Sequence, residues 1–268
     1  MGGGVATASV AALWPRIAAA QGRPARILLV GDSMIAGAFG LFLAQALRET
    51  HGWSVHREGK SSTGLSRPDF FDWISRGKQL AEVVAPFDAT VCMFGGNDGQ
   101  GLFMGKKAEP RWIRYGEEGW DEEYRRRVVA FADAVTPPGG SLHWIGMPVM
   151  GPEKLHRRMR HLNRIYRGET CICPRCHFID VWGDLADARG RYTKRMKVDG
   201  KRTSVRADDG VHLTVKGAKY LVGLVAPRIA GRVATGGDVR TGPLGSASAG
   251  PAEREVAPSP GEPHPSEE

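Results

Sequence analysis

Three short polar motifs in the sequence combine the residue types that hydrolytic chemistry uses. They are Gly-Asp-Ser at residues 31–33, Gly-Gly-Asn-Asp at residues 95–98 and Asp-Asp-Gly-Val-His at residues 208–212. The first two each follow an apolar run that predicts a buried strand, and the third precedes the last predicted helix. Because the carboxyl ends of parallel strands lie on one edge of a sheet, the three motifs can converge there.

Ser33, His212 and Asp209 together have the composition of a nucleophilic triad. Ser33 would attack an acyl carbon while His212 accepts its proton as the general base. Asp209 precedes His212 by three residues, so it can fold back within one turn and accept a hydrogen bond from the second imidazole nitrogen. Asp208 is the alternative partner, at a less favourable spacing. Asp32, next to the serine, is expected to cap or brace the turn.

The same reaction needs hydrogen-bond donors for the oxyanion of a tetrahedral intermediate. The candidates are the backbone N–H of Ser33 at a helix N-terminus, the side-chain amide of Asn97 and a loop N–H such as that of Gly64. Losing one donor of this kind typically lowers turnover about a hundredfold or more.

The elements that must position these residues alternate between strand and helix. The predicted strands are at residues 27–30, 53–56, 89–94, 141–150 and 177–182, and the predicted helices are at residues 39–50, 79–85, 120–135, 153–168 and 211–233. Strands separated by helices indicate an α/β domain with a parallel sheet and helices on both faces. Thr214 is the expected cap of the last helix.

The three motifs, in this order, resemble the first, third and fifth blocks of the SGNH (GDSL-type) hydrolase family over residues 26–233. The resemblance implies a three-layer α/β/α sandwich with a five-stranded parallel sheet of flavodoxin-like topology. It also implies Ser33 as the nucleophile, carboxylic ester hydrolysis and no cofactor. The family's second block is a loop glycine, for which Gly64 is preferred over Gly59. The loop at residues 62–73 and the W-D-x-x-Y-R run after it resemble a bacterial branch largely of unknown function.

An insertion at residues 102–119 interrupts the general pattern of that family. Trp112 and Trp120, at this insertion, are the candidates for contact with the substrate. The alternative for both is packing in the core or in a lid, which is the more common role of tryptophan.

Charge and hydropathy limit the class of partner. The chain has 268 residues and a net charge of +8, yet residues 235–268 carry two basic and six acidic residues. A basic body is compatible with an anionic polymer such as nucleic acid or an acidic polysaccharide as partner, but a soluble surface rich in arginine is the preferred interpretation. No nucleic-acid-binding motif accompanies the charge, so nucleic acid is not expected. No apolar run is long enough for a transmembrane segment, and the oligomeric state stays open.

The ends of the chain differ in composition from its centre. Residues 1–25 are interpreted as a leader or a loose N-terminal segment, and residues 26–233 as the hydrolase domain. Residues 234–268, rich in Gly, Pro, Ser and Glu, predict a disordered tail. A periplasmic or secreted location is favoured over a cytoplasmic one.

The four cysteines do not form a disulfide scaffold at this chain length. Cys92 lies in an apolar run and is predicted to be a core thiol. Cys171, Cys173 and Cys176 have a spacing that does not match the usual zinc knuckles, and no metal is expected. In an exporting compartment, one local disulfide with a spare thiol is favoured, while the redox state itself stays open.

The leading hypothesis is therefore a serine esterase that removes an acetyl or other short acyl group from a small molecule or glycan, such as a carbohydrate or cell-wall polymer. An O-acyltransferase using the same acyl-enzyme is one alternative, because water or a sugar hydroxyl can resolve that intermediate. A non-catalytic polysaccharide-binding module is the other.

Overall fold

A computed structural model describes residues 23–233, and its centre is a parallel sheet. Its strands, in the spatial order β2-β1-β3-β6-β7, have these bounds: β1 Arg26–Gly31, β2 Ser54–Gly59, β3 Ala89–Met93, β6 Ser141–Ile145 and β7 Cys176–Ile179. All four neighbouring pairs are parallel. The predicted five-stranded parallel sheet of flavodoxin-like order is confirmed.

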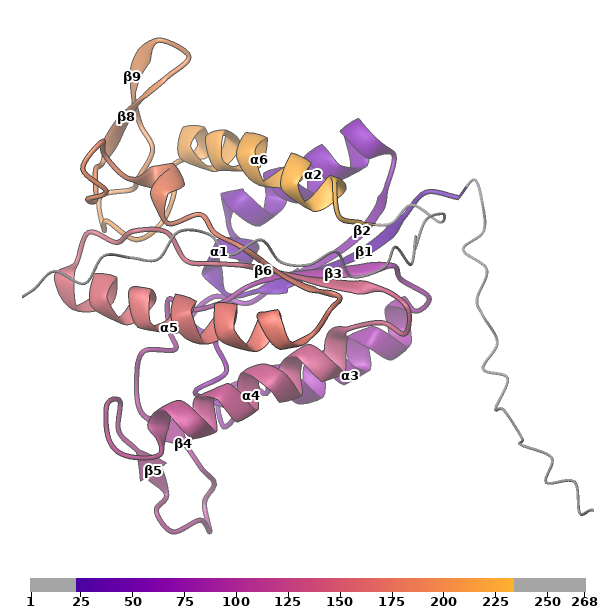
Figure 1. The fold of residues 1–268 in the computed structure, drawn as a ribbon, viewed down its shortest axis with the longest axis vertical. Helices are drawn as coiled ribbons and strands as arrows, with labels where there is room; N and C mark the ends of the chain where they lie inside the picture. Colours follow the sequence, from indigo (N-terminus) through magenta and orange to yellow (C-terminus); the bar gives the residue numbers. More distant parts are fainter. Residues whose placement is uncertain (1–22, 234–268) are drawn as a thin grey trace, which may run out of the picture. The chain divides into compact units, whose positions relative to one another are not determined.

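Helices cover both faces of this sheet (Figure 1). On one face lie α2 (Ala38–His51) and α6 (Val215–Ala230), and on the other lie α3 (Trp73–Val84), α4 (Trp120–Val135) and α5 (Glu153–Ile172). The short helix α1 (Ser33–Ala36) follows β1 directly, and a 3-10 turn, η1, spans Gly183–Leu185. The three-layer α/β/α sandwich is confirmed.

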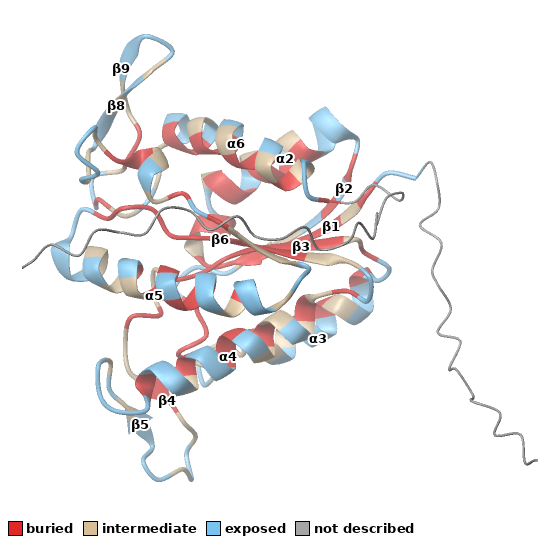
Figure 2. Cartoon of the chain, in the orientation of Figure 1, coloured by how far each residue is buried: buried red, intermediate tan, exposed pale blue. Residues whose placement is uncertain are grey.

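The core lies between the sheet and its two helical layers. Ile27, Leu28, Leu29 and Val30 of β1 have no exposed surface, and all of β3 is buried as well. These strands are apolar without alternation because helices pack on both faces. Figure 2 shows the burial along the central strands. Among the described residues, no helix is both long and apolar enough to cross a membrane.

The strand predicted at residues 141–150 and the helix predicted at residues 211–233 were too long, since β6 ends at Ile145 and α6 spans Val215–Ala230. Two other predicted elements were too short, because hydrogen bonds continue past the apolar residues. Strand β2 extends to Gly59, since Arg57 and Glu58 still pair with β1 in register. Helix α3 begins at Trp73, before the predicted residue 79, because Asp72 caps it by accepting the N–H groups of Ile74 and Ser75 at 3.0 Å each. The predicted cap of α6 is confirmed: the hydroxyl of Thr214 accepts the Gly217 N–H.

Two small antiparallel hairpins were not predicted. Strands β4 (Leu102–Phe103) and β5 (Trp112–Ile113) form one within the insertion, and β8 (Arg195–Val198) and β9 (Lys201–Ser204) form the other. The predicted leader lies mostly, and the predicted tail entirely, outside the described residues.

Candidate active site

The structure brings Ser33, Asp209 and His212 together at the carboxyl edge of the sheet. The Oγ of Ser33 lies 2.9 Å from Nε2 of His212, and the Nδ1 of His212 lies 2.6 Å from Oδ2 of Asp209. Ser33 is the first residue of α1, whereas the other two lie in the loop between β9 and α6. With the Nδ1–H tautomer, His212 donates to Asp209 and its Nε2 can accept the serine proton.

The loop at residues 207–212, here called the Asp-His loop, fixes the carboxylate by its own backbone. The second carboxylate oxygen of Asp209 accepts the N–H groups of Val211 at 2.8 Å and His212 at 2.9 Å. Partial burial opposes ionisation of Asp209, but the hydrogen bonds from the His212 imidazole and the two N–H groups outweigh it and lower its pKa to about 2. The alternative, Asp208, is exposed and pairs with Lys194 instead of His212.

A buried arginine that sequence reasoning missed holds this loop from inside. Nη2 of Arg206 donates to the carbonyl oxygens of Val211 at 2.8 Å and Gly210 at 3.3 Å. Burial lowers the Arg206 pKa to about 10, and its Nε and Nη1 have no hydrogen-bond partner within residues 23–233. No motif marked this residue, because its partners are backbone carbonyls that come near it only in the folded chain.

Gly210 and Gly151 join the Asp-His loop to the start of α5. The Gly151 N–H donates to the Gly210 carbonyl at 2.9 Å. Gly210 has a φ of +69°, and a Cβ there would lie 3.1 Å from the Gly151 Cα and 3.3 Å from the Tyr192 hydroxyl. Only glycine satisfies both the left-handed backbone and the close approach. Tyr192, another residue that the sequence did not single out, therefore borders the loop.

Asp32 connects the first two motifs. Its Oδ1 accepts the Met34 N–H at 2.9 Å, which confirms the predicted cap, and its Oδ2 accepts the Gly96 N–H at 3.2 Å. Complete burial raises the pKa of Asp32 to about 7, with a smaller contribution from the charge of Asp98, while its N–H donors act in the opposite direction.

The other two oxyanion candidates lie in neighbouring loops that Asp98 holds together. The Asn97 side-chain amide donates to the Thr63 carbonyl at 3.1 Å, and Asp98 Oδ1 accepts the Ser66 N–H at 2.8 Å. A Cβ on Gly64 would lie 2.4 Å from Asp98 Oδ1, so the loop closes only with glycine there. Within residues 23–233, neither the Ser33 nor the Gly64 backbone N–H donates to another residue.

A cavity of about 320 Å³ lies beside Ser33. Its lining includes Ser33, His212 and, from the loop after β2, Ser61; the other lining residues are Met34, Ala36, Gly37, Ala38, Phe39 and Leu213. Asn97 and Gly64 are not among them. Their predicted role as oxyanion donors stays a prediction.

The structure separates the two predicted substrate-contacting tryptophans. Trp120 is completely buried: its Nε1 donates to the Gln100 carbonyl at 2.8 Å, and its ring stacks on Tyr124. The prediction of substrate contact is therefore wrong for Trp120, which packs α4 against the loop after β3. Trp112 is 38% exposed and packs edge-on against Phe103, with its role still a prediction.

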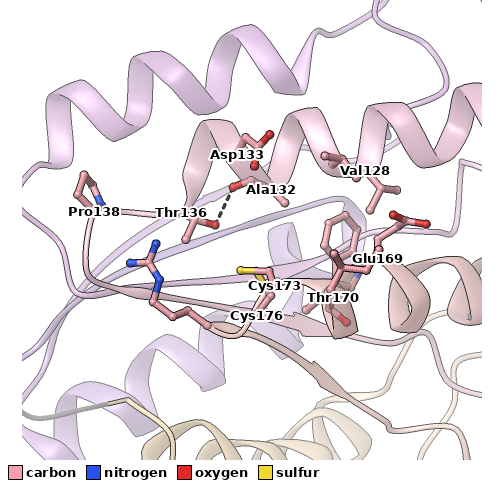
Figure 3. Close-up of a pocket in the computed structure, with 13 residues that line it drawn as sticks. Val128, Ala132, Asp133, Thr136, Pro138, Glu169, Thr170, Cys173 and Cys176 are labelled. Carbon is pink, nitrogen blue, oxygen red and sulfur yellow. Dashed lines mark hydrogen bonds between the residues drawn. The ribbon is translucent and has the colours of Figure 1, made fainter. Parts of the chain in front are cut away.

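A second cavity, of about 560 Å³, lies between the C-terminal parts of α4 and α5 and the start of β7 (Figure 3). Cys173 and Cys176 line it, with their side chains next to each other. All four cysteines are free thiols, so the predicted local disulfide is wrong in this structure. Cys171 is exposed on the last turn of α5. Burial, and to a smaller extent the neighbouring Cys173 thiol, raises the pKa of Cys176 to about 12, which keeps the Cys176 thiol protonated.

Comparison with known proteins identifies the fold of the chain but does not identify its activity. Residues 26–228 match the model of a family described as "Protein of unknown function (DUF459)". No curated protein matches the chain.

Solved structures of several esterases have the same fold. The aryl esterase of M. smegmatis is 17% identical, with a TM-score of 0.54 over 78% of this chain and 99% of that one. A carbohydrate acetylesterase from Sinorhizobium meliloti is 15% identical, with a TM-score of 0.52 over 78% and 99%. A catalytic mutant of an acetylxylan esterase from Geobacillus stearothermophilus is 13% identical, with a TM-score of 0.51 over 77% and 95%. The chain has the SGNH hydrolase fold, as the motif resemblance implied.

Proposed function

Because the chain belongs to the DUF459 family, of unknown function, and has the fold of SGNH esterases, we propose that it is a serine esterase that hydrolyses a carboxylic ester. The observation that carries the proposal is the pair of hydrogen bonds through His212, at 2.9 Å to Ser33 and 2.6 Å to Asp209. Side chains from two distant parts of the sequence thus lie in the spatial order that a nucleophile, a general base and an orienting acid require.

In the proposed reaction, Ser33 Oγ attacks the ester carbon while His212 Nε2 takes the hydroxyl proton. Asp209, ionised because of its low pKa, stabilises the imidazolium and holds its tautomer. The tetrahedral oxyanion accepts hydrogen bonds from the Ser33 N–H and, in this proposal, from Gly64 and Asn97. His212 then returns the proton to the leaving alcohol, and water attacks the acyl-enzyme through the same base.

The proposed substrate is an acetyl or other short acyl ester on a carbohydrate. The cavity beside Ser33, about 320 Å³, is at the small end of ligand sites, which supports a short acyl group. Two proteins with the same fold are named for carbohydrate substrates, a carbohydrate acetylesterase and an acetylxylan esterase. Catalytic mutants of the latter replace an aspartate or a serine, the residue types of this proposal.

The test is p-nitrophenyl acetate hydrolysis by the wild type, Ser33→Ala and, as a matched control, Ser54→Ala. Ser54 is an exposed serine at the start of β2, at the opposite end of that strand from the site. Ser33→Ala is expected to lower kcat by about a thousandfold or more, because the nucleophile is lost. Ser54→Ala is expected to keep the wild-type rate. Equal rates in wild type and Ser33→Ala would refute the esterase proposal.

A further inference from the structure

The hairpin of β8 and β9 projects from the domain at the end where α5 and α6 begin (Figure 1). Its two strands are joined by Asp199 and Gly200, with φ values of +48° and +78°. Two successive positive φ angles form the tight two-residue turn typical of a stable hairpin.

The pairing register divides the hairpin into two faces. Arg195 lies opposite Ser204, and Lys197 lies opposite Arg202, so these side chains share one face. The other face carries Met196 and Val198, which pack against the core cluster. The face away from the core is therefore defined by Arg195, Lys197 and Arg202, all three exposed, and is here called the cationic face.

The charge of the cationic face is not compensated within the described part of the chain. No acidic side chain of residues 23–233 forms an ion pair with Arg195, Lys197 or Arg202. Lys197 and Arg202 are also direct cross-strand neighbours, and like charges in that position repel and destabilise the hairpin. An anion bound between the two would remove this repulsion.

The base of the hairpin is bonded to the Asp-His loop. Lys194, just before β8, pairs with Asp208, and its carbonyl accepts the Val205 N–H at 3.0 Å. The chain then runs from β9 through Arg206 to Asp209. Arg202 precedes Asp209 by seven residues, so the two are at most about 25 Å apart. An extended polymer can therefore contact the cationic face and the serine together.

We propose that the cationic face binds the anionic groups of an acylated glycan polymer and holds its ester near Ser33. The cleavage of the ester in this inference rests on the proposed esterase function. The binding of anionic groups rests on the exposed cations of the hairpin. Arginine and lysine at exposed positions recognise carboxylate or phosphate groups by charge and hydrogen bonds. The proposed substrate class is therefore an anionic glycan and not a neutral one.

Two other polyanions fit less well. A nucleic acid chain carries no carboxylic ester for the proposed reaction. A lipid surface carries esters, but membrane binding needs apolar side chains to enter the bilayer, and none of the exposed large hydrophobic residues of the described chain lies on this hairpin.

The test compares the full-length wild type with a variant carrying Arg195→Gln, Lys197→Gln and Arg202→Gln. A matched control carries Lys78→Gln, Arg175→Gln and Arg232→Gln, which removes three exposed cations outside the hairpin. The substrates are O-acetylated polygalacturonate, O-acetylated xylan, which is neutral, and p-nitrophenyl acetate. Binding of non-acetylated polygalacturonate is measured separately by calorimetry, at low and high salt.

The hairpin variant is expected to lose about tenfold or more of kcat/KM on the anionic polymer relative to p-nitrophenyl acetate, because each exposed ion contact changes an equilibrium about two- to fivefold. The loss is expected to shrink at high salt, and the control variant is expected to match the wild type. Equal losses in both variants, no loss in the hairpin variant, or an equal loss on neutral xylan would overturn the inference. So would tighter wild-type binding of single-stranded DNA than of polygalacturonate at equal charge.

The two proposals fail separately. If no ester is cleaved, the esterase proposal fails, while the calorimetric affinities of the two variants still test the cationic face.

Discussion

Asp208 and Asp209 are adjacent and chemically identical, yet the structure gives them different environments. Asp209 receives three hydrogen bonds from its own loop, whereas Asp208 is exposed and pairs with Lys194. The difference follows from loop geometry, because only the residue three positions before His212 can reach its Nδ1 through a single turn. Position in the loop, and not residue type, decides which carboxylate can orient the imidazole.

Replacing Asp209 by Asn is expected to lower kcat on p-nitrophenyl acetate by about a hundredfold to ten-thousandfold. An amide can present its NH₂ group to Nδ1 and thereby favour the wrong imidazole tautomer. Asp208→Asn is the matched control and is expected to change kcat less than about threefold, since it loses only an exposed ion pair. Comparable kcat values for the two variants would contradict the assigned orientation.

Trp120 shows why single residues are hard to place from sequence. A tryptophan beside an insertion is consistent with a substrate platform, but the helical spacing of Trp120, Tyr124, Val128, Phe131 and Val135 is that of one buried face of α4. That periodicity was available in the sequence and predicts a core position. The helical period therefore determines the buried position of Trp120, and its adjacency to the insertion does not.

At the scale of elements, the sequence predicted those strands and helices that have a run or a regular spacing of apolar residues and that end at a glycine or a polar loop. Strands β1 and β3 end at Gly31 and just before Gly95, so the positions of Ser33 and Asn97 followed from the chain order. The β8–β9 hairpin was missed although Asp199-Gly200 is a strong turn signal. Strand β8 alternates basic and apolar residues over only four positions, and β9 has no large apolar residue, so neither carries a strong strand pattern.

The contacts between elements could not be read from the sequence at all. The Gly151–Gly210 hydrogen bond joins two loops that are far apart in the chain, and Arg206 meets carbonyl groups only after the loop has formed. Such contacts depend on the three-dimensional path and leave no spacing rule in the sequence.

Gly210→Ala is expected to lower the free energy of unfolding by about 1–2 kcal/mol and to lower kcat/KM on p-nitrophenyl acetate at least tenfold. The left-handed φ of +69° disfavours alanine, and the new Cβ would push the loop away from Gly151. Gly139→Ala is the control: its φ is +77°, and nothing lies within 4 Å of its Cβ position. It is expected to be destabilised similarly while keeping its activity. Equal activity in both variants would show that the close contact at Gly210 does not position the site.

At the scale of the whole molecule, folding buries two carboxyl groups behind the site. Burial raises the pKa of Asp32 to about 7 and that of Asp98 to about 6, and hydrogen bonds to each only partly oppose the shift. In the unfolded chain both would titrate near pH 4. Between these values the native state binds more protons than the unfolded state, so stability falls as pH rises. Asp209 acts in the opposite sense, and its contribution is lost as pH falls from about 4 to 2.

The free energy of unfolding of the wild type is therefore expected to fall between pH 4.5 and pH 8. Asp32 alone contributes up to about 3 kcal/mol to this fall. In Asp32→Asn the fall is expected to be smaller, even if the variant is less stable at both pH values because a backbone acceptor is lost. Urea denaturation at the two pH values measures both differences. Parallel pH dependences in the two proteins would show that Asp32 does not titrate in this range.

The separation of Ser33 and His212 along the chain also determines when their contact can form during synthesis. The two residues are 179 positions apart along the chain, and a ribosome adds about 5–20 residues per second, so roughly 9–36 s pass between their synthesis. During that interval the nascent chain contains the proposed nucleophile, Ser33, but not the proposed general base, His212. The proposed Ser33–His212 pair therefore cannot form until residue 212 has been synthesised, and the proposed ester cleavage is delayed by at least that interval.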